Sequence, residues 1–365
     1  MMAAMPEAPR AGDLIGGRYR LIEVAGRGGM ADVWRAEVEG DMGFRRVVAV
    51  KQMHPALAEQ RNYVEMFVEE ARLGAVLESP NLSEVRDFIA EDGNFYMVME
   101  WIEAVDLGTW TRWHYERGEG PRWELVAAIG IGMLRGLAAA HERHGGDGAV
   151  VPVVHRDVSP HNVLLTTRGM VKVIDFGLAL AHDRQAETTD PGVVKGKMSY
   201  LSPEIVSGQR PVPPSDQFAV GSVLWEALVG RKLFDGQNDY ETYVRLRDCQ
   251  VQPLRPLRPD VPSDFAALIH RALSPRPEQR FPSTREFARQ IGTTLKKVQL
   301  RRDLHSVLAR SVNDARATLG LGHRTGDLSA LTPVAELRPE EPAAIGERLR
   351  GLRHRLPGFL GRKKA

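Results

Sequence analysis

The stretch HRDVSPHN at residues 155–162, followed twelve residues later by DFGLA at 175–179, decides both the fold and the chemistry of this chain. Asp157 carries a carboxylate that could accept or orient the proton of a substrate hydroxyl group. Asn162 and Asp175 supply hard oxygen ligands, which suit Mg²⁺ better than nitrogen or sulfur does. Chance occurrence of these groups in this order is negligible, so we treat them as parts of one site.

A glycine-rich stretch, GRGGMADVWRA, lies upstream at residues 26–36. Gly26, Gly28 and Gly29 follow a strand-like run, and their lack of a Cβ lets backbone N–H groups approach phosphates closely. The residues after them alternate as in a strand, whereas a dinucleotide-binding fingerprint requires a helix there. The spacing therefore favours a phosphate-binding strand–turn–strand; a glycine-rich hairpin without a ligand is the alternative.

Lys51 ends the β-like run VVAVK at residues 47–51. Its ammonium group could neutralise phosphate oxygens if a carboxylate orients it. Glu70, on a predicted helix that follows, is the candidate partner. Glu69 is the alternative if the helix is aligned differently by one residue. For either glutamate alone, the alternative is a solvated surface charge.

The pattern of apolar residues divides the chain into two lobes. Between residues 18 and 100, short runs rich in Val, Ile, Tyr and Phe are separated by glycine-containing turns, as in β-strands, and one helix is predicted over 62–77. From about residue 107, segments such as 123–144 and 215–230 predict long, mostly buried helices. We therefore predict a small β-rich lobe, a hinge at 100–106 and a larger helical lobe.

Composition excludes several classes of protein. The 49 basic and 47 acidic residues leave a formal charge of +2, which argues against a nucleic-acid partner. The single cysteine, Cys249, excludes an intrachain disulfide, and no Cys/His metal cluster is present in the sequence. We find no run of about 18 apolar residues typical of a transmembrane helix, and residues 1–17 lack the pattern of a secretory signal. These features predict a cytoplasmic chain.

Together the motifs resemble those of the bacterial eukaryotic-like serine/threonine protein kinases, over roughly residues 18–291. Ala31 replaces the third glycine of that family's loop, and SPE at 202–204 resembles its A-P-E motif. The resemblance implies an α+β, two-lobed protein kinase fold with ATP between the lobes. It also implies a serine/threonine kinase that transfers the γ-phosphoryl group of ATP to proteins with Mg²⁺, for which Mn²⁺ could substitute.

The resemblance also implies a set of nucleotide-site residues. Met99 would be the gatekeeper, Glu100 and Ile102 would hydrogen-bond adenine through their backbones, and Asp106 would contact the ribose. Val33, Ala49 and Leu164 would sandwich the base, although ordinary core packing is the alternative for these three. The full set of nucleotide-site residues is Gly26, Gly28, Gly29, Val33, Ala49, Lys51, Glu70, Met99, Glu100, Ile102, Asp106, Leu164 and Asp175, with Asn162 and Asp175 as metal ligands.

Two further roles implied by the resemblance are structural. Glu204 would pair with Arg280, and Asp216 would anchor the backbone of the catalytic loop. The rival from another class is a pseudokinase, a nucleotide-binding signalling scaffold. Retention of Lys51 and Asp157, together with the two metal ligands, counts against it.

Two catalytic positions depart from the family pattern together. Ser159 replaces the usual lysine of the catalytic loop, and Lys197 replaces a threonine of the segment before SPE. We predict that Lys197 supplies the missing ammonium group; the alternative is that it pairs with substrate or solvent. Arg156 before the catalytic aspartate predicts phosphorylation of the activation segment, residues 175–204, by the chain itself or a second copy. Thr189 is the favoured acceptor over Thr188, with loop-filling polar residues as the alternative.

The flanking segments are assigned by composition. Residues 1–17 read as a flexible leader, 18–101 as the N-lobe, 102–292 as the C-lobe, 293–325 as a helical extension, and 326–365 as linker and basic tail. Leucines at helical spacing among arginines and lysines in 345–365 predict contact with an anionic membrane or an acidic partner. A disordered solubilising tail is the alternative.

Overall fold

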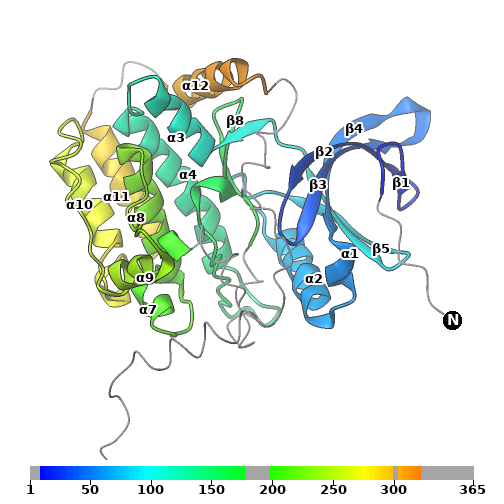
Figure 1. Cartoon of the computed structure of the whole chain (residues 1–365), viewed down its shortest axis with the longest axis horizontal. Coiled ribbons are helices and arrows are strands. Elements are labelled where there is room, and N and C mark those ends of the chain that lie inside the picture. Colours follow the sequence, from blue (N-terminus) through cyan, green and yellow to red (C-terminus); the bar gives the residue numbers. More distant parts are fainter. Residues whose placement is uncertain (1–8, 177–197, 299–302, 322–365) are drawn as a thin grey trace, which may run out of the picture. The chain divides into compact units, whose positions relative to one another are not determined.

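The computed structural model describes residues 9–176, 198–298 and 303–321, and a six-stranded sheet comes first along the chain. The strands are antiparallel and lie in the order β1-β2-β3-β4-β6-β5 (Figure 1). Their bounds are β1 Leu14–Ile15, β2 Tyr19–Arg27, β3 Ala31–Glu39, β4 Arg45–Met53, β5 Val85–Glu91 and β6 Asn94–Glu100.

Alternation along β4 sorts its side chains onto the two faces of this sheet. Val48 and Val50 are buried in one apolar cluster with Trp34 and Val98. Side chains of a strand alternate between faces, so Ala49 and Lys51 lie on the other face. That face is the one on which the predicted site residues of this lobe gather.

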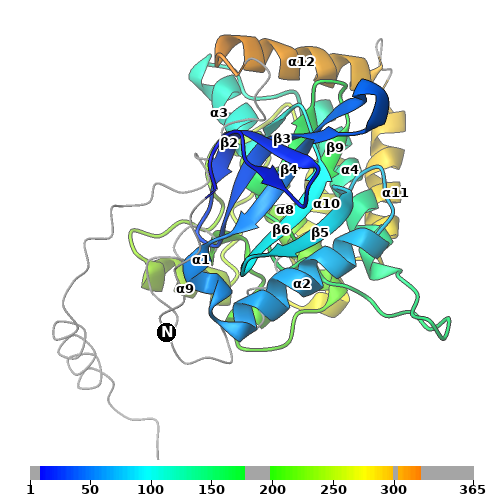
Figure 2. The same ribbon diagram turned by 90° about the vertical axis from the view of Figure 1, so that its right-hand side faces the viewer.

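Helix α2, Arg61–Val76, forms where the sequence predicts a helix over 62–77. Met66, Phe67, Ala71 and Leu73 are buried at helical spacing. Phe67 and Ala71 share a cluster with Met53 and Met97, and α2 packs beside β5 (Figure 2). The short helix α1, Pro55–Ala58, precedes it.

The second part of the described chain is mostly helical, around one large apolar core. Two helices at its centre are α4, Trp123–His141, and α8, Pro213–Val229, which pack against each other. A small sheet of β7 Ala104–Asp106, β8 Val163–Thr166 and β9 Val171–Val173 lies against α4. The remaining helices are α3 Leu107–Glu116, α7 Pro203–Val206, α9 Asp239–Arg247, α10 Ser263–Ala272, α11 Thr284–Lys296 and α12 Leu304–Thr318.

Helix α4 is the only helix in the described ranges that is long and apolar enough to span a membrane. The sequence shows no uninterrupted run of that length, because Glu124 and Arg135 break the apolar stretch of α4. In the structure, 72% of its apolar window is buried inside the fold. Its hydropathy is therefore accounted for by its place in the core.

Three expected boundaries differ from the observed ones. Residues 14–15, assigned to the leader, pair with β2 as strand β1. The helix predicted over 123–144 ends at His141, where an irregular hairpin closed by the His144–Val150 bridge begins. Within the predicted 293–325 extension, α11 runs to Lys296 and the separate helix α12 follows.

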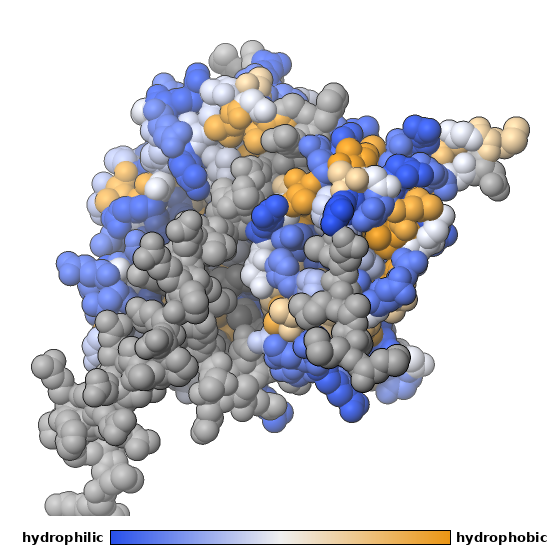
Figure 3. All heavy atoms as spheres, turned by 45° about the vertical axis from the view of Figure 1, so that its right-hand side comes forward, coloured by the Kyte–Doolittle hydropathy of each residue, from blue (hydrophilic) through white to orange (hydrophobic). Residues whose placement is uncertain are grey.

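The face shown in Figure 3 is mostly hydrophilic where residues are described, with scattered hydrophobic patches. Large apolar side chains with high exposure include Met42 and Phe44, at the hairpin between β3 and β4, and Tyr240 of α9. Scattered exposed apolar residues are normal for a globular domain.

Candidate active site

Lys51 lies at the centre of a three-residue ion cluster. It projects from β4 opposite Val33 of β3. Its Nζ donates to Glu70 Oε1 at 2.7 Å and to Asp175 Oδ1 at 2.9 Å. Burial disfavours the charged form of Lys51, but the carboxylates of Asp175 and Glu70 hold its pKa above the ordinary lysine value. The ammonium group is therefore charged at any physiological pH.

The structure distinguishes Glu70 from its neighbour Glu69. The Glu69 side chain is 54% exposed and lies 3.9 Å from Arg72, on the outer side of α2. The Glu70 side chain is 19% exposed and faces the sheet. Successive residues on a helix point about 100° apart, so only one of the two can reach Lys51.

Asp157 and Asn162 are joined within the catalytic loop. Asn162 Nδ2 donates to the Asp157 carbonyl oxygen at 2.8 Å and to its carboxylate Oδ2 at 2.9 Å. Ile174 N donates to Asn162 O at 3.0 Å, and this bond ties the loop to the strand before Asp175. Ser159, which replaces the usual lysine, is buried in the same loop.

Asp216 of α8 holds the start of this loop. Its carboxylate accepts from the backbone N–H groups of His155 at 2.8 Å and Arg156 at 3.1 Å. His141 Nε2 lies 2.7 Å from the same carboxylate. Burial alone would raise the pKa of Asp216, but His141, through its hydrogen bond and charge, and then His155 lower it. Arg156 has a φ of 70°, a strained conformation that this anchoring helps to hold.

The stretch leading to Asp175 is fixed by His155. The imidazole Nε2 of His155 lies 3.0 Å from Ile174 O, and its ring stacks obliquely on Phe176 with centroids 4.7 Å apart. Asp175 itself has a φ of 56°. This left-handed residue turns its carboxylate toward Lys51.

The glycine-rich stretch forms the β2–β3 hairpin, as predicted. Gly28 N donates to Ala31 O at 3.0 Å, and an added Cβ at Gly28 would lie 3.1 Å from that oxygen. At Gly29 no atom lies within 4 Å of the position of a Cβ. The turn is therefore open on one side. The imidazole Nε2 of His54, a contact that the sequence analysis missed, lies 2.7 Å from Gly28 O.

The predicted base-binding residues come from two sheets. Ala49 pairs with Met99 in the large sheet. Leu164 clusters with Ile102 beside the small sheet. Ala49, Leu164 and Ile102 are all nearly buried, at 6–8% exposed. This places apolar groups of both lobes beside the chain segment that joins them.

Asp106 has a different environment from the one expected. Its carboxylate caps α3 by accepting from Thr109 N at 3.0 Å, and His161 Nδ1 lies 3.1 Å away. Asp106 is 3% exposed. An aspartate directly before an amphipathic helix is a common N-cap signal, which the sequence analysis did not use. Contact with a ribose stays a prediction.

Lys172, which the sequence analysis also missed, contacts the hinge from β9. Its Nζ lies 2.5 Å from Glu100 Oε1 and donates to Leu82 O at 3.0 Å. The side chain of Glu100 is therefore engaged by the protein, whereas the role predicted for it concerns only its backbone. No local sequence pattern signals a pair separated by so many residues.

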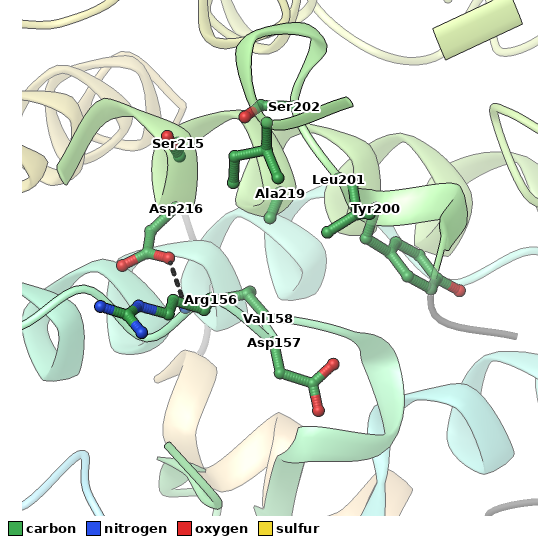
Figure 4. A pocket seen from close by; sticks show the side chains of 10 residues that line it. Arg156, Asp157, Val158, Tyr200, Leu201, Ser202, Ser215, Asp216 and Ala219 are labelled. Atoms are coloured by element: carbon green, nitrogen blue, oxygen red, sulfur yellow. Dashed lines mark hydrogen bonds between the residues drawn. The ribbon is translucent and has the colours of Figure 1, made fainter. Parts of the chain in front are cut away.

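A small pocket adjoins the catalytic loop on the side of α7 and α8 (Figure 4). In that view Asp157 comes from the catalytic loop and Tyr200 from the segment before α7, and Asp216 bonds to the loop at Arg156. The pocket is lined by Arg156, Asp157, Val158, Tyr200, Leu201, Ser202, Ile205, Ser215, Asp216 and Ala219.

The expected Glu204–Arg280 ion pair is present and buried behind this pocket. Both guanidinium nitrogens, Nη1 and Nη2, donate to the carboxylate at 2.7 Å. The two side chains are 3% and 0% exposed. Burial opposes the charged form of Glu204, but Arg280 lowers its pKa overall. The pair fixes the segment 202–204 to the helical lobe.

The donor set fits Mg²⁺ bound together with phosphates. Among the described residues, no group of three or more His, Cys, Asp or Glu side chains could hold a metal ion by itself. Mg²⁺ commonly takes one or two carboxylates and completes its shell with phosphates and water. Asp175 and the amide oxygen of Asn162 supply ligands of that kind.

Several predicted residues lie outside the described ranges. These are Thr188, Thr189 and Lys197, together with the basic tail at 345–365.

Comparisons with known proteins agree with this geometry. A family model described as a protein kinase domain matches residues 19–290. The tyrosine-protein kinase MasK of Myxococcus xanthus is 38% identical over 279 residues, 76% of this chain and 43% of MasK. The serine/threonine-protein kinase PrkC of Bacillus subtilis is 32% identical, covering 77% of this chain and 41% of PrkC. The serine/threonine-protein kinase PknA of Mycobacterium tuberculosis is 33% identical, covering 78% of this chain and 63% of PknA.

The chain thus spans less than two thirds of the length of each of these curated relatives. Among solved structures, the PknI kinase domain of M. tuberculosis is 26% identical with a TM-score of 0.58, covering 79% of this chain and 99% of that domain. The likeness confirms the predicted fold class, a small β-rich lobe followed by a larger helical one.

Proposed function

The chain belongs to the protein kinase family, and on this premise we propose that it transfers the γ-phosphoryl group of ATP to Ser or Thr hydroxyl groups of proteins. The observation that carries the proposal is the cluster of Lys51 with Glu70 and Asp175, next to the paired Asp157 and Asn162. A phosphoryl-transfer enzyme needs charge and position rather than covalent chemistry, and these residues supply both.

Each residue has a role in this proposal. Asp157 orients the acceptor hydroxyl and takes its proton, because its carboxylate is held by Asn162 in the catalytic loop and Asp157 lines the adjoining pocket. Lys51, held by Glu70, neutralises phosphate oxygens. The backbone of the hairpin at Gly26, Gly28 and Gly29 covers the phosphates, and the apolar residues of both lobes enclose the base.

Asn162 and Asp175 would hold Mg²⁺, with Mn²⁺ as a substitute. The ion would supply charge neutralisation on the phosphates when bound. Both ligands are held in place by hydrogen bonds within the protein. Asn162 donates to Asp157, and Asp175 accepts from Lys51.

Serine and threonine are the acceptors we propose. PrkC and PknA are named serine/threonine-protein kinases, whereas MasK is named a tyrosine-protein kinase. The sequence motifs of this chain resemble those of the serine/threonine-protein kinases. The threonine replaced by Lys197 is associated with Ser/Thr selectivity, and phosphosite mapping tests the acceptor class.

We propose further that Lys197 supplies the ammonium group that Ser159 lacks. The electrostatic requirement of the transferred phosphate is positional, so a cation from either side satisfies it. Lys197→Ala should lose about a hundredfold or more in kcat, and Ser159→Lys/Lys197→Thr should restore activity. Full activity of Lys197→Ala would exclude a catalytic role for the Lys197 ammonium group.

Activation-segment phosphorylation is the proposed control. A phosphate on Thr189 or Thr188, added by the chain itself or by a second copy, would neutralise Arg156 next to the catalytic aspartate. We also propose a cytoplasmic location, with the basic tail on an anionic membrane or acidic partner. Liposome binding that is unchanged by deletion of residues 344–365 would exclude a membrane role for the tail.

The competing proposal is a nucleotide-binding scaffold without transfer activity. The two are separated by comparing wild type with Asp157→Asn for transfer to a generic protein acceptor and for ADP affinity. A kinase should lose at least about a hundredfold in transfer in the variant while ADP affinity is kept. Background transfer by both proteins, with intact ADP binding, would establish the scaffold instead.

A further inference from the structure

Helix α12 lies beyond residues 19–290, the part matched by the family model. Asp303 caps it by accepting from Ser306 N at 2.9 Å. Leu308, Val312, Ala315 and Arg316 recur at helical spacing and are all buried. Three of these four are apolar, so the buried charge of Arg316 requires a separate explanation.

The helix is docked by polar as well as apolar contacts. It packs against α3, α4, β7 and β8, and Figure 1 shows it beside α3. Trp110 Nε1 donates to Ser311 Oγ at 2.9 Å. At Gly169, in the β8–β9 turn, an added Cβ would lie 2.1 Å from His305 O. The close approach shows that this turn and α12 fit each other specifically.

Two consecutive carbonyl groups of the hinge are satisfied from the side of α12. Arg316 Nη1 donates directly to Ala104 O at 2.7 Å. Glu103 O accepts from Thr167 N at 2.9 Å, and Thr167 O in turn accepts from Asn313 Nδ2 at 2.9 Å. These carbonyls lie in the Glu103–Ala104 and Ala104–Val105 peptide planes, so their hydrogen bonds restrict the chain one and two peptide units after the carbonyl of Ile102.

Arg316 is suited to hold a backbone segment rather than to act at the surface. It is 6% exposed, and burial lowers its pKa, opposed by the nearby charge of Glu103. Hydrogen bonds from a charged donor are stronger than those between neutral groups. The guanidinium also donates to Leu321 O at 3.3 Å, which joins the end of α12 to the same point.

We propose that α12 is a positioning element of the nucleotide site and that Arg316 is its main positioning residue. By fixing the carbonyl of Ala104 directly and that of Glu103 through Thr167, α12 restricts the chain after Ile102 and so orients the backbone groups of Ile102 toward adenine. This inference rests on the proposed function, because it takes Ile102 as the adenine partner. It adds a contribution from a helix outside the matched domain.

The test uses the full chain and three substitutions on one helix. Arg316→Met keeps much of the side-chain volume but removes the donors. Asn313→Ala removes the indirect link at an exposed position, and Arg310→Met changes an exposed arginine of the same helix as the matched control. The readouts are KM for ATP, kcat at saturating ATP, KM for the acceptor and the affinity for ADP.

We expect Arg316→Met to raise KM for ATP and Kd for ADP about tenfold, equivalent to about 1.4 kcal/mol. Asn313→Ala should raise both about two- to threefold, a smaller change because its link is indirect. Acceptor KM and kcat should stay within about twofold, as should all values for Arg310→Met. A merely structural role would instead lower kcat through loss of folded enzyme and leave KM for ATP unchanged.

Unchanged KM and Kd in Arg316→Met and Asn313→Ala would overturn the inference. If Arg316→Met does not fold, Asn313→Ala decides alone. Absence of ADP binding by the wild type would overturn the proposed function, and this inference with it. Normal wild-type binding with unaffected variants would overturn only the role of α12.

Discussion

At the scale of single residues, Lys51 depends on three separate parts of the fold. The register of β4 against β3 sets its face, α2 brings Glu70, and the left-handed backbone of Asp175 brings the second carboxylate. A shift in any of these would leave a buried ammonium group with one partner fewer. This makes the cluster sensitive to small changes in Glu70.

Glu70→Gln should reduce kcat/KM about 10- to 100-fold, because a hydrogen bond to a charged group contributes roughly 1.5–3 kcal/mol. The matched control is Glu69→Gln, one residue away and 54% exposed, which should stay within about twofold. Steady-state kinetics on both variants checks this. Equal losses in the two variants would contradict the arrangement of α2.

The sequence favoured Glu70 as the partner of Lys51 but left the adjacent Glu69 as an alternative. The choice depends on the rotation of α2 against the sheet, which Phe67 and Ala71 set by burying their side chains there. The environment of Asp106 could not be predicted from the sequence either. Its contact with His161 joins segments 55 residues apart, and no local pattern signals such a pair.

At the scale of elements, α4 approaches its neighbours closely through glycines. An added Cβ at Gly136 would lie 2.7 Å from the backbone oxygen of Asn81, in the segment between α2 and β5. At Gly292, within α11, the nearest atom to such a Cβ is Ile131 Cδ1 at 4.0 Å. The same substitution therefore has opposite consequences in two helices of one core.

Gly136→Ala should lower the free energy of unfolding by about 1–3 kcal/mol, because a backbone oxygen cannot move aside cheaply. Gly292→Ala should raise it by roughly 0.5–1 kcal/mol, because alanine favours the helix and meets only ordinary contact. Urea unfolding of both variants measures the difference. A stabilised Gly136→Ala would contradict the observed packing of α4.

The long helices could be predicted individually from periodicity, whereas β5 and the small sheet of β7, β8 and β9 were not predicted. The helices predicted over 62–77 and 215–230 correspond to α2 and α8 within about two residues, because their apolar spacing and flanking residues are local signals. Strand β1 was not predicted, since two residues carry no period. The helix within 293–325 was expected, but its docking on the hinge depends on Arg316 meeting a distant carbonyl.

At the scale of the whole molecule, the described residues form one unit in which the site draws on both lobes. The matched domain supplies the ion cluster and the catalytic loop, and α12 adds a contact to the hinge from outside that domain. Relatives such as MasK and PrkC are more than twice as long as the part matched here. Their full activities and partners are therefore not carried over to this chain.

The most direct test of the central claim is phosphosite mapping by mass spectrometry after incubation with ATP and Mg²⁺. Dephosphorylated wild type and Asp157→Asn are treated in parallel. A Ser/Thr kinase should gain phosphate on serine or threonine, including Thr188 or Thr189, only in the wild type. Phosphate confined to tyrosine would contradict the acceptor class, and no phosphate in the wild type, or equal phosphate in both proteins, would contradict transfer by this site.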